Sequence, residues 1–324
     1  MSDTKYAYAV ARIRAMEVSL FSAATIEQLI ACKSYAACLD FLREKGWGDS
    51  EGEKTAEAIL EREEEKIWEV MRELSVDQKN FEVLFYQNWF HNLKAAIKKV
   101  CTGDNDTRNI YFEGTNMEPE QIERAIREKD FASLPEFMQE VAQEAVETML
   151  HSADGQLCDC MIDQATLRAI MQAGKKSENQ VIKAYAENTV AVANIKIAVR
   201  SQKTGKSKDF MERSMVECDS LNIQSLMMAA LGGQDAICEY LTGNGYGEAA
   251  EALKQSPSAF ERWCDNRMIQ TMKPQKSNPF SVGPLVAYVL ARENEIKTVR
   301  IILTCKQNDL ADDAIRERVR EMYV

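Results

Sequence analysis

The sequence has only two histidines, and its nine cysteines are scattered without the paired spacing of a metal site. A tetrahedral zinc centre needs four nitrogen or sulfur ligands, which usually occur as closely spaced pairs. Cys158 and Cys160 form one such pair, but no second pair completes it. An odd number of cysteines also argues against a disulfide framework. We therefore expect reduced core thiols, no metal and no cofactor.

Proline and glycine, which end helices and form turns, number only 6 and 14 in 324 residues. Alternating β-branched runs bounded by turn residues, which would indicate strands, are also hard to find. With 45% hydrophobic and 28% charged residues, the composition is that of a globular protein. The chain is predicted to be all-α and is long enough for two or three domains.

Long apolar runs and excess positive charge are lacking as well. No uncharged stretch reaches the ~20 apolar residues of a membrane span, and Met1–Glu17 lacks the apolar region of a secretory signal. We therefore expect a cytoplasmic protein. The formal charge of -11 repels nucleic acid phosphates unless a basic face is segregated, and none is visible. Apolar residues recur at helical spacing around the acidic segment Glu61–Lys66, which is interpreted as a solvated helix face.

The sequence also lacks the motifs of nucleotide binding. Thr204–Ser207 reads TGKS, but a phosphate-binding loop requires a glycine where Arg200 stands. The glycine-rich stretch Gly243–Gly247 does not follow the GxGxxG pattern and is interpreted as a turn that ends a helix.

One acidic cluster, Asp309–Asp313, could suggest an all-α enzyme that uses Mg²⁺ and a diphosphate substrate. No second acidic cluster matches it. An N-cap formed by Asp309 or Asp312 ahead of a helix explains the cluster better. No serine, cysteine or lysine nucleophile has an evident base. We therefore expect no enzyme activity and no small-molecule substrate.

A helical segment occurs three times. Asn92-Leu93-Lys94 returns as Asn194-Ile195-Lys196, and a weaker copy, Ile296–Leu303, places Arg300 at the lysine position. The period of about 100 residues is too long for a solenoid, whose periods are ~20 to 50 residues. The sequence therefore predicts three similar helical domains, which comprise residues 1–112, 113–210 and 211–324.

Glycine turns recur with the same copies. Gly46-Trp47-Gly48 matches Gly245-Tyr246-Gly247, whereas the middle copy, near Phe137, lacks this turn. Gly103 and Gly205 follow the first two long helices, and we expect both to end these helices in the left-handed conformation.

The basic residue at the matched position is Lys94, Lys196 or Arg300. A repeated anion site is one interpretation. Because these helices are apolar on most sides, a buried stem with an acidic partner is the interpretation that we favour.

Three stretches together resemble one family: Tyr6–Glu17, Leu42–Asp49 and Pro284–Val324. The chain resembles the C subunit of the bacterial and archaeal V/A-type rotary ATPases, and is similar to the eukaryotic d subunit, over essentially its full length. The resemblance implies three helical domains around a pseudo-threefold axis, forming a funnel. It also implies a place between the central shaft, built from the D and F subunits, and the membrane proteolipid ring. It brings no catalytic residues.

The expected function is a non-catalytic rotor socket that couples the shaft to the ring for proton or sodium transport, linked to ATP hydrolysis or synthesis. The expected location is the cytoplasmic face of the membrane, through the ATPase complex. A helical scaffold or signalling adaptor unrelated to any ATPase is the alternative. Polar residues in the best-matched segments are candidates for partner contacts, with ion pairs inside one domain as the alternative: Arg12, Arg14, Arg292, Glu293 and Glu295.

Overall fold

The computed structural model describes most of the chain and is helical throughout the part described. No strand and no helix that is both long and apolar enough to cross a bilayer occurs in that part, and the all-α prediction is confirmed. The described residues are 6–49, 55–74, 81–103, 110–112, 117–152 and 154–324.

The chain forms two compact units. The first, unit 1, is discontinuous and combines Met1–Asp77 with Gly245–Val324, whereas unit 2 is the continuous stretch Gln78–Asn244. The division into three similar domains, the pseudo-threefold axis and the funnel stay predictions.

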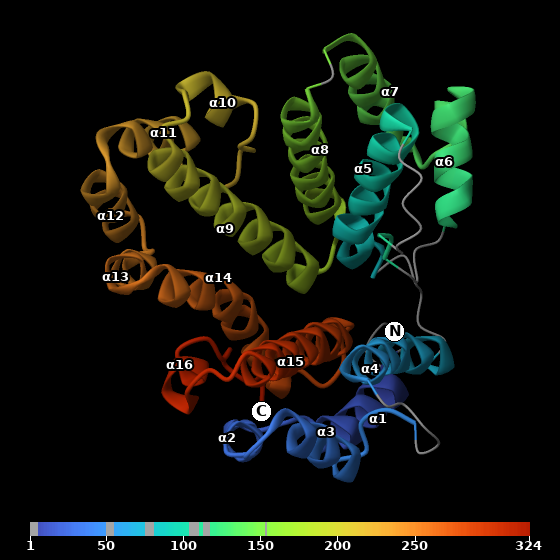
Figure 1. Ribbon diagram of the computed structural model, residues 1–324, viewed down its shortest axis with the longest axis vertical. Coiled ribbons are helices and arrows are strands. Elements are labelled where there is room, and N and C mark those ends of the chain that lie inside the picture. Colours follow the sequence, from blue (N-terminus) through green and yellow to red (C-terminus); the bar gives the residue numbers. More distant parts are fainter. Residues whose placement is uncertain (1–5, 50–54, 75–80, 104–109, 113–116, 153) are drawn as a thin grey trace. The chain divides into compact units, whose positions relative to one another are not determined.

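Unit 1 is built around one long helix, α15 (Gly283–Gln307), which contacts α1, α2, α3, α4, α14 and α16 (Figure 1). Most of its residues are buried, because valine, isoleucine, leucine and alanine occupy nearly all of its sides. The other elements are α1 (Ala7–Glu17), α2 (Ala23–Ile30), α3 (Tyr35–Glu44), α4 (Ala56–Glu73), α13 (Gly247–Gln255), α14 (Pro257–Met272), the 3-10 helix η4 (Lys273–Ser277) and α16 (Asp312–Arg316).

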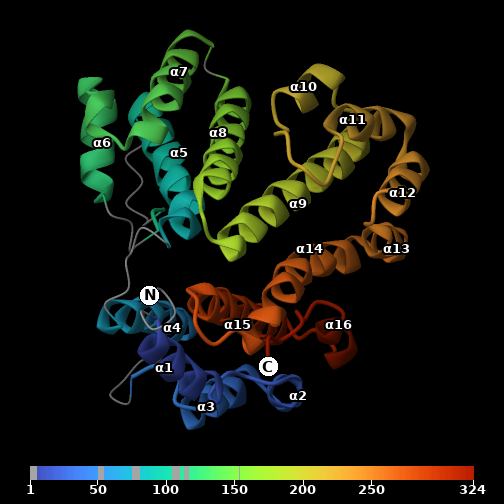
Figure 2. The ribbon, with the colours of Figure 1, turned by 180° about the vertical axis from the view of Figure 1, so that it is seen from behind.

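In unit 2, several helices that follow one another in the chain also pack against each other. Helix α8 contacts α5, α7 and α9, and α9 also contacts α11 and α12 (Figure 2). The elements are η2 (Glu82–Phe85), α5 (Tyr86–Thr102), α6 (Pro119–Glu128), η3 (Phe131–Ser133), α7 (Glu136–Ser152), α8 (Gly155–Lys176), α9 (Gln180–Thr204), α10 (Lys208–Glu212), α11 (Ile223–Gly232) and α12 (Gln234–Gly243).

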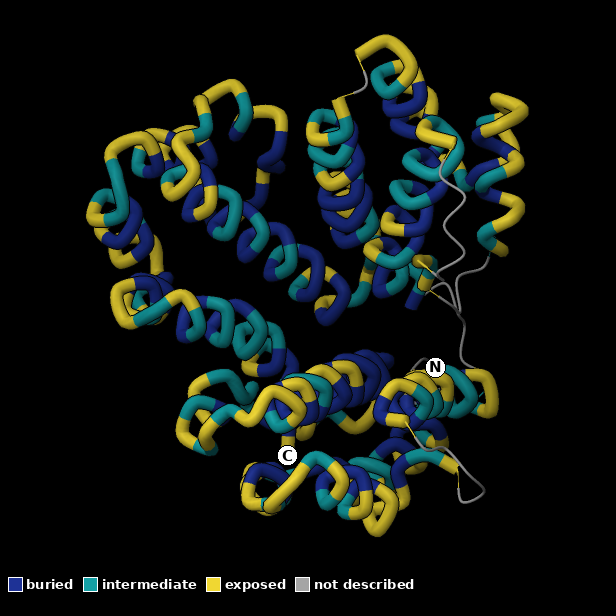
Figure 3. Tube along the Cα trace, in the orientation of Figure 1, coloured by how far each residue is buried: buried dark blue, intermediate teal, exposed yellow. Residues whose placement is uncertain are grey.

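Helix α9 is the counterpart of α15 in unit 2. Buried and half-buried residues follow most of its length, and its exposed residues lie near its two ends (Figure 3). Helix α8 packs tightly against it at Gly174, where a Cβ atom would lie 2.3 Å from the Cβ of Ala186. Only glycine fits at this crossing, because carbon atoms in contact lie about 3.5–4.0 Å apart.

Helix ends follow the capping chemistry that the sequence indicates. Gly103 and Gly205 take φ values of 66° and 63° after α5 and α9, so the predicted left-handed ends are confirmed. At helix N-termini, a Ser, Thr, Asp or Asn side chain often accepts a hydrogen bond from a backbone N–H in the first turn. The Asp154 carboxylate at the start of α8, for example, accepts from the Leu157 N–H at 2.9 Å.

Candidate functional site

Two long helices of unit 2 each hold a later chain segment through a buried asparagine. On α5, Asn92 donates from Nδ2 to the Phe112 carbonyl at 2.9 Å and accepts from the Phe112 N–H at 2.8 Å. On α9, Asn194 makes the same two bonds with Val216, at 2.7 and 3.1 Å. One amide thus satisfies both backbone groups of a single residue and fixes the segment in register.

Helix α15 carries a related contact. Asn294 donates from Nδ2 to the Glu321 carbonyl at 2.9 Å. It lies one helical turn before Thr298, the residue that the predicted repeat matches with Asn194. Thr298 is buried, and its hydroxyl donates to the Asn294 carbonyl at 2.8 Å. All three matched helices therefore hold a later segment through an amide, although the third does so one turn earlier.

Replacing Asn194 by alanine is expected to cost about 2–3 kcal/mol of unfolding free energy. The change leaves both backbone groups of Val216 buried without their partner, and each unsatisfied group costs ~1–3 kcal/mol. Denaturant unfolding measures the loss. Asn308→Ala is the control, because the Asn308 side chain is exposed and donates only to the Thr304 carbonyl. Equal losses in the two variants would contradict the prediction.

Two of the three matched basic residues are paired with carboxylates of their own units. Lys94 donates to Asp163 on α8, and Arg300 donates to two carboxylates of α4 at 2.9 and 3.2 Å. The interpretation of the matched basic residues as cations with acidic partners is therefore confirmed for Lys94 and Arg300. Lys196 is half-buried on α9.

The repeated glycine turn closes α3 and follows α12. Gly46 and Gly245 both take a φ of 82°, in the region that favours glycine. After α3, the Gly46 N–H donates to the Arg43 carbonyl at 2.9 Å and the Trp47 N–H to the Leu42 carbonyl at 3.0 Å. These bonds satisfy carbonyls that the end of a helix otherwise leaves free.

An arginine covers the aromatic ring of each turn. The Arg292 guanidinium lies 5.3 Å from the ring centre of Trp47, and that of Arg267 lies 5.5 Å from Tyr246. Both rings are buried. Because a guanidinium is attracted to the face of an aromatic ring, each turn is tied to a neighbouring helix of unit 1.

Arg292 is also the centre of a buried ion cluster. Its guanidinium donates to Glu63 on α4 and to Glu295 on α15. The three residues are 8%, 3% and 2% exposed, respectively. Charges this far from water are stable only when paired and fully hydrogen-bonded.

The remaining oxygens of the cluster bind backbone and lysine. Glu63 accepts from the Gly48 N–H at 2.9 Å and from Lys66 Nζ at 2.6 Å, and Glu295 accepts from the Phe21 N–H. Burial raises the pKa of Glu295, while Arg292 and the Phe21 N–H oppose this rise. The ion cluster (Glu63, Arg292 and Glu295) therefore joins the α1–α2 link, the Gly46–Gly48 turn, α4 and α15.

The solvated-face interpretation of Glu61–Lys66 is wrong for Glu63. Its carboxylate faces the interior, whereas Glu61 and Glu65 are exposed. The sequence held a signal for this outcome, because Glu63 stands four residues from Ile59 and four from Ile67. That spacing puts it on the apolar side of α4.

Arg292 and Glu295, two of the five candidates for partner contacts, are thus engaged inside unit 1. Arg14 is half-buried and donates to Glu17 at 2.7 Å and to the Gln275 carbonyl at 2.6 Å. All these contacts lie inside unit 1. The ion pairs Arg14–Glu17 and Arg292–Glu295 each lie inside one predicted domain, whereas Arg292–Glu63 joins the first and third predicted domains.

Arg12 and Glu293 lie at the surface. Arg12 is exposed on α1 and makes no hydrogen bond or ion pair with any residue in the described ranges. Tyr8 stands one turn earlier on the same side of α1 and is 75% exposed. Val18, which follows the helix, is 86% exposed. Glu293 is exposed on α15.

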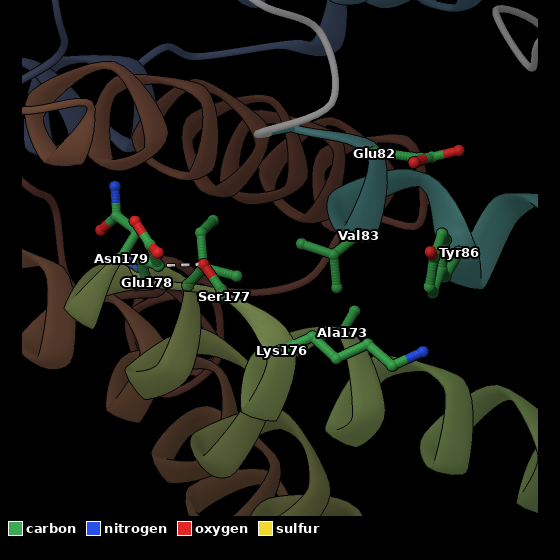
Figure 4. Close-up of a pocket in the computed structure, with 9 residues that line it drawn as sticks. Glu82, Val83, Tyr86, Ala173, Lys176, Ser177, Glu178 and Asn179 are labelled. Atoms are coloured by element: carbon green, nitrogen blue, oxygen red, sulfur yellow. Dashed lines mark hydrogen bonds between the residues drawn. The ribbon is translucent and has the colours of Figure 1, made fainter.

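A polar depression of about 520 Å³ in unit 2 lies beside η2, the start of α5 and the α8–α9 turn (Figure 4). The Asn179 N–H donates to Ser177 Oγ at 3.1 Å in that turn. Tyr86 is at its edge, and burial together with Glu82 raises the pKa of Tyr86 to about 12. A tyrosine that stays protonated at neutral pH cannot serve as a base.

The acidic turn after α15 does not form the predicted cap. Ala311 occupies the N-cap of α16, so the prediction for Asp309 or Asp312 is wrong. The Asp312 carboxylate accepts from Lys306 Nζ at 2.8 Å instead. Within the described part of the chain, no group of three or more His, Cys, Asp or Glu side chains is arranged to hold a metal ion.

The structure describes an all-helical protein whose long helices are fixed by buried amide and ion-pair contacts. A family model described as the ATP synthase (C/AC39) subunit matches residues 9–318, which is nearly the whole chain. The chain belongs to this family and is therefore a subunit of a rotary ATPase.

Named relatives come from bacteria and archaea. The C subunit of the V-type sodium ATPase of Enterococcus hirae is 22% identical over 96% of this chain and 97% of its own length. The C subunit of the A-type ATP synthase of Methanocaldococcus jannaschii is 23% identical over 96% of this chain and 85% of its own length. The same A-type protein of a Desulfurococcus species is 20% identical over 98% and 92%.

Proposed function

We propose that this protein is a non-catalytic central-stalk subunit, a socket that couples the shaft of a V/A-type rotary ATPase to its membrane ring. The family match over residues 9–318 carries the proposal. The alternative of an adaptor unrelated to any ATPase draws no support from that match.

The construction of the two units suits a mechanical role. Transmitting torque requires a body that does not yield, and close-packed helices have low compressibility. In unit 1 the ion cluster holds four separate chain segments together. In unit 2 the asparagine contacts fix the links that follow α5 and α9. Rotation passes through such a body without any bond being made or broken.

The proposed partners are the D and F subunits of the shaft on one side and the proteolipid ring on the other. The protein then resides at the cytoplasmic face of the membrane, bound through the complex. The transported ion is a proton or sodium, since one relative is named as part of a sodium ATPase and others as parts of ATP synthases.

Co-purification tests this role. Tagged D and F subunits are expressed with this chain and the ring, and we expect the captured complex to contain the chain in fixed stoichiometry. ATP hydrolysis coupled to ion transport in vesicles should require the chain, although the purified chain alone should not hydrolyse ATP. Capture of the shaft and ring without the chain would refute the proposal.

The outer side of α1 is the candidate partner surface that we propose to test first. Arg12→Glu is expected to weaken retention by the complex roughly 3- to 10-fold at low salt, because a rim charge steers association. The fold should be unaffected, since Arg12 is exposed and binds no described residue. Lys33→Glu makes the same charge change at another exposed site of unit 1 and serves as the control. Equal retention of both variants would remove Arg12 from the interface.

A further inference from the structure

Two cysteines of unit 1 lie together at the C-terminal end of α2. The Cys32 thiol donates to the Gln28 carbonyl at 3.5 Å, and the Cys38 thiol donates to the Leu29 carbonyl at 3.6 Å. These carbonyls belong to consecutive residues in the last turn of the helix. Because consecutive helix residues are only ~1.5 Å apart along the axis, both thiols are held at the same place.

The two thiols also act on each other. Burial raises the pKa of Cys38 to about 12, and the charge and hydrogen bond of its neighbour Cys32 add to this rise. Lys306 opposes the rise, whereas Asp312 adds to it. Both cysteines are free in the structure. Cys38 is therefore a protonated thiol at neutral pH, with a second thiol beside it.

The two thiols differ in their access to solvent. Cys38 lies in the first turn of α3 and is 0% exposed, whereas Cys32 is half-buried in the link between α2 and α3. A small molecule therefore reaches Cys32 first. The link is not helical, so Cys32 can adjust to the geometry that a bond between the two sulfurs requires.

We propose that Cys32 and Cys38 form an oxidisable dithiol, which a small-molecule disulfide such as glutathione disulfide converts to an intramolecular disulfide. The Cys32 thiolate attacks one sulfur of the oxidant, the S–S bond of the oxidant breaks, and one thiolate leaves. Cys38 then loses its proton to water and attacks the Cys32 sulfur, and the second thiolate leaves.

The exchange is balanced without any other reactant. Two protein S–H groups are oxidised to one S–S bond, and the oxidant is reduced to two thiols. The two protons that the cysteines release reach the two departing thiolates through the solvent.

The dithiol is connected to the end of α15. The Cys32 carbonyl accepts from Lys306 Nζ at 2.9 Å, and the same ammonium donates to Asp312 at 2.8 Å. A bond between Cys32 and Cys38 draws the α2–α3 link towards α3 and so moves one acceptor of Lys306. The inference does not rest on the rotor role, because the isolated chain is sufficient to test it.

Peptide mapping by mass spectrometry tests the proposal on the full chain. The folded, reduced protein is incubated with glutathione disulfide, its remaining thiols are blocked with N-ethylmaleimide in denaturant, and trypsin is added. Trypsin cuts after Lys33, between the two cysteines, so the disulfide joins residues 15–33 to residues 34–43 in one species. We expect this linked species, with maleimide labelling of both cysteines lowered about 10-fold.

Single variants separate the roles of the two thiols. In Cys38→Ser, Cys32 should stop at the mixed disulfide and gain the mass of one glutathione. In Cys32→Ser, Cys38 should stay reduced because it is buried. The matched control is Cys160→Ser, which removes a half-buried thiol whose hydrogen-bond partner is the Ser214 hydroxyl. This control should form the Cys32–Cys38 bond like the unmodified chain.

The second step should be faster at higher pH, since Cys38 attacks only as the thiolate. A lasting mixed disulfide at Cys32 of the unmodified chain overturns the proposal, as does recovery of both cysteines as free thiols. Formation of the linked species only after the chain is unfolded also overturns it, because the native contact is then not the cause.

Discussion

Replacing Arg292 by leucine is expected to lower the unfolding free energy by about 3–5 kcal/mol and the melting temperature by roughly 10 °C. The change leaves Glu63 and Glu295 as buried carboxylates without their shared cation. It also removes the guanidinium from the face of Trp47. Differential scanning calorimetry of the full chain measures the shift.

The loss should depend on pH with a defined sign. Without Arg292, burial raises the folded-state pKa of the two carboxylates above their unfolded values. A carboxylate with a raised folded pKa lowers stability as pH rises through that pKa, because the folded state then holds more protons than the unfolded state. The difference between variant and unmodified chain should therefore shrink as pH falls from 7 towards 5.

Two further variants separate this mechanism from a general loss of packing. Adding Glu63→Gln and Glu295→Gln to Arg292→Leu should recover part of the stability, since neutral amides still accept the Gly48 and Phe21 N–H groups. Arg316→Leu is the control, because Arg316 also bridges two carboxylates but is exposed. Its cost should be much smaller than that of Arg292→Leu, because exposed ion pairs are screened by water. Equal losses at Arg292 and Arg316 would contradict the role of burial.

Replacing Gly174 by alanine should destabilise unit 2 by about 1–3 kcal/mol, the cost of overfilling a packed interior. The added methyl would meet the Cβ of Ala186 at 2.3 Å, so α8 and α9 must move apart. Alanine also has the higher helix propensity, by about 1 kcal/mol, but the overlap outweighs this gain. Denaturant unfolding followed by circular dichroism measures the result.

The same substitution at the start of α8 gives the control. A Cβ atom on Gly155 meets nothing within 4 Å, so Gly155→Ala should leave stability unchanged or raise it by up to about 1 kcal/mol. Adding Ala186→Gly to Gly174→Ala removes the opposing methyl and should restore much of the loss. Equal destabilisation by Gly174→Ala and Gly155→Ala would contradict the role of the overlap with Ala186.

The helical nature of the chain and the repeated elements were predictable from the sequence, because helix periodicity and glycine positions are local properties. Gly103 and Gly205 end their helices as expected. The acidic partners of Lys94 and Arg300 lie on other helices. The sequence indicated that these cations have acidic partners but not which residues the partners are.

The ion cluster was not predictable in full, because its members are far apart in the chain. Glu63 and Arg292 are separated by 229 residues, and no local pattern links them. The apolar spacing around Glu63 showed that it faces inward but not which cation it meets.

The discontinuity of unit 1 sets an order for folding during synthesis. Residues of unit 2 leave the ribosome together and can fold at once, whereas α1 to α4 must wait for α15. At ~5–20 residues per second, the roughly 250 intervening and final residues take about 10–50 s to make. Throughout that interval Glu63 has no arginine to meet, and the N-terminal helices expose the apolar sides that α15 later covers. This nascent segment is where a chaperone would be needed.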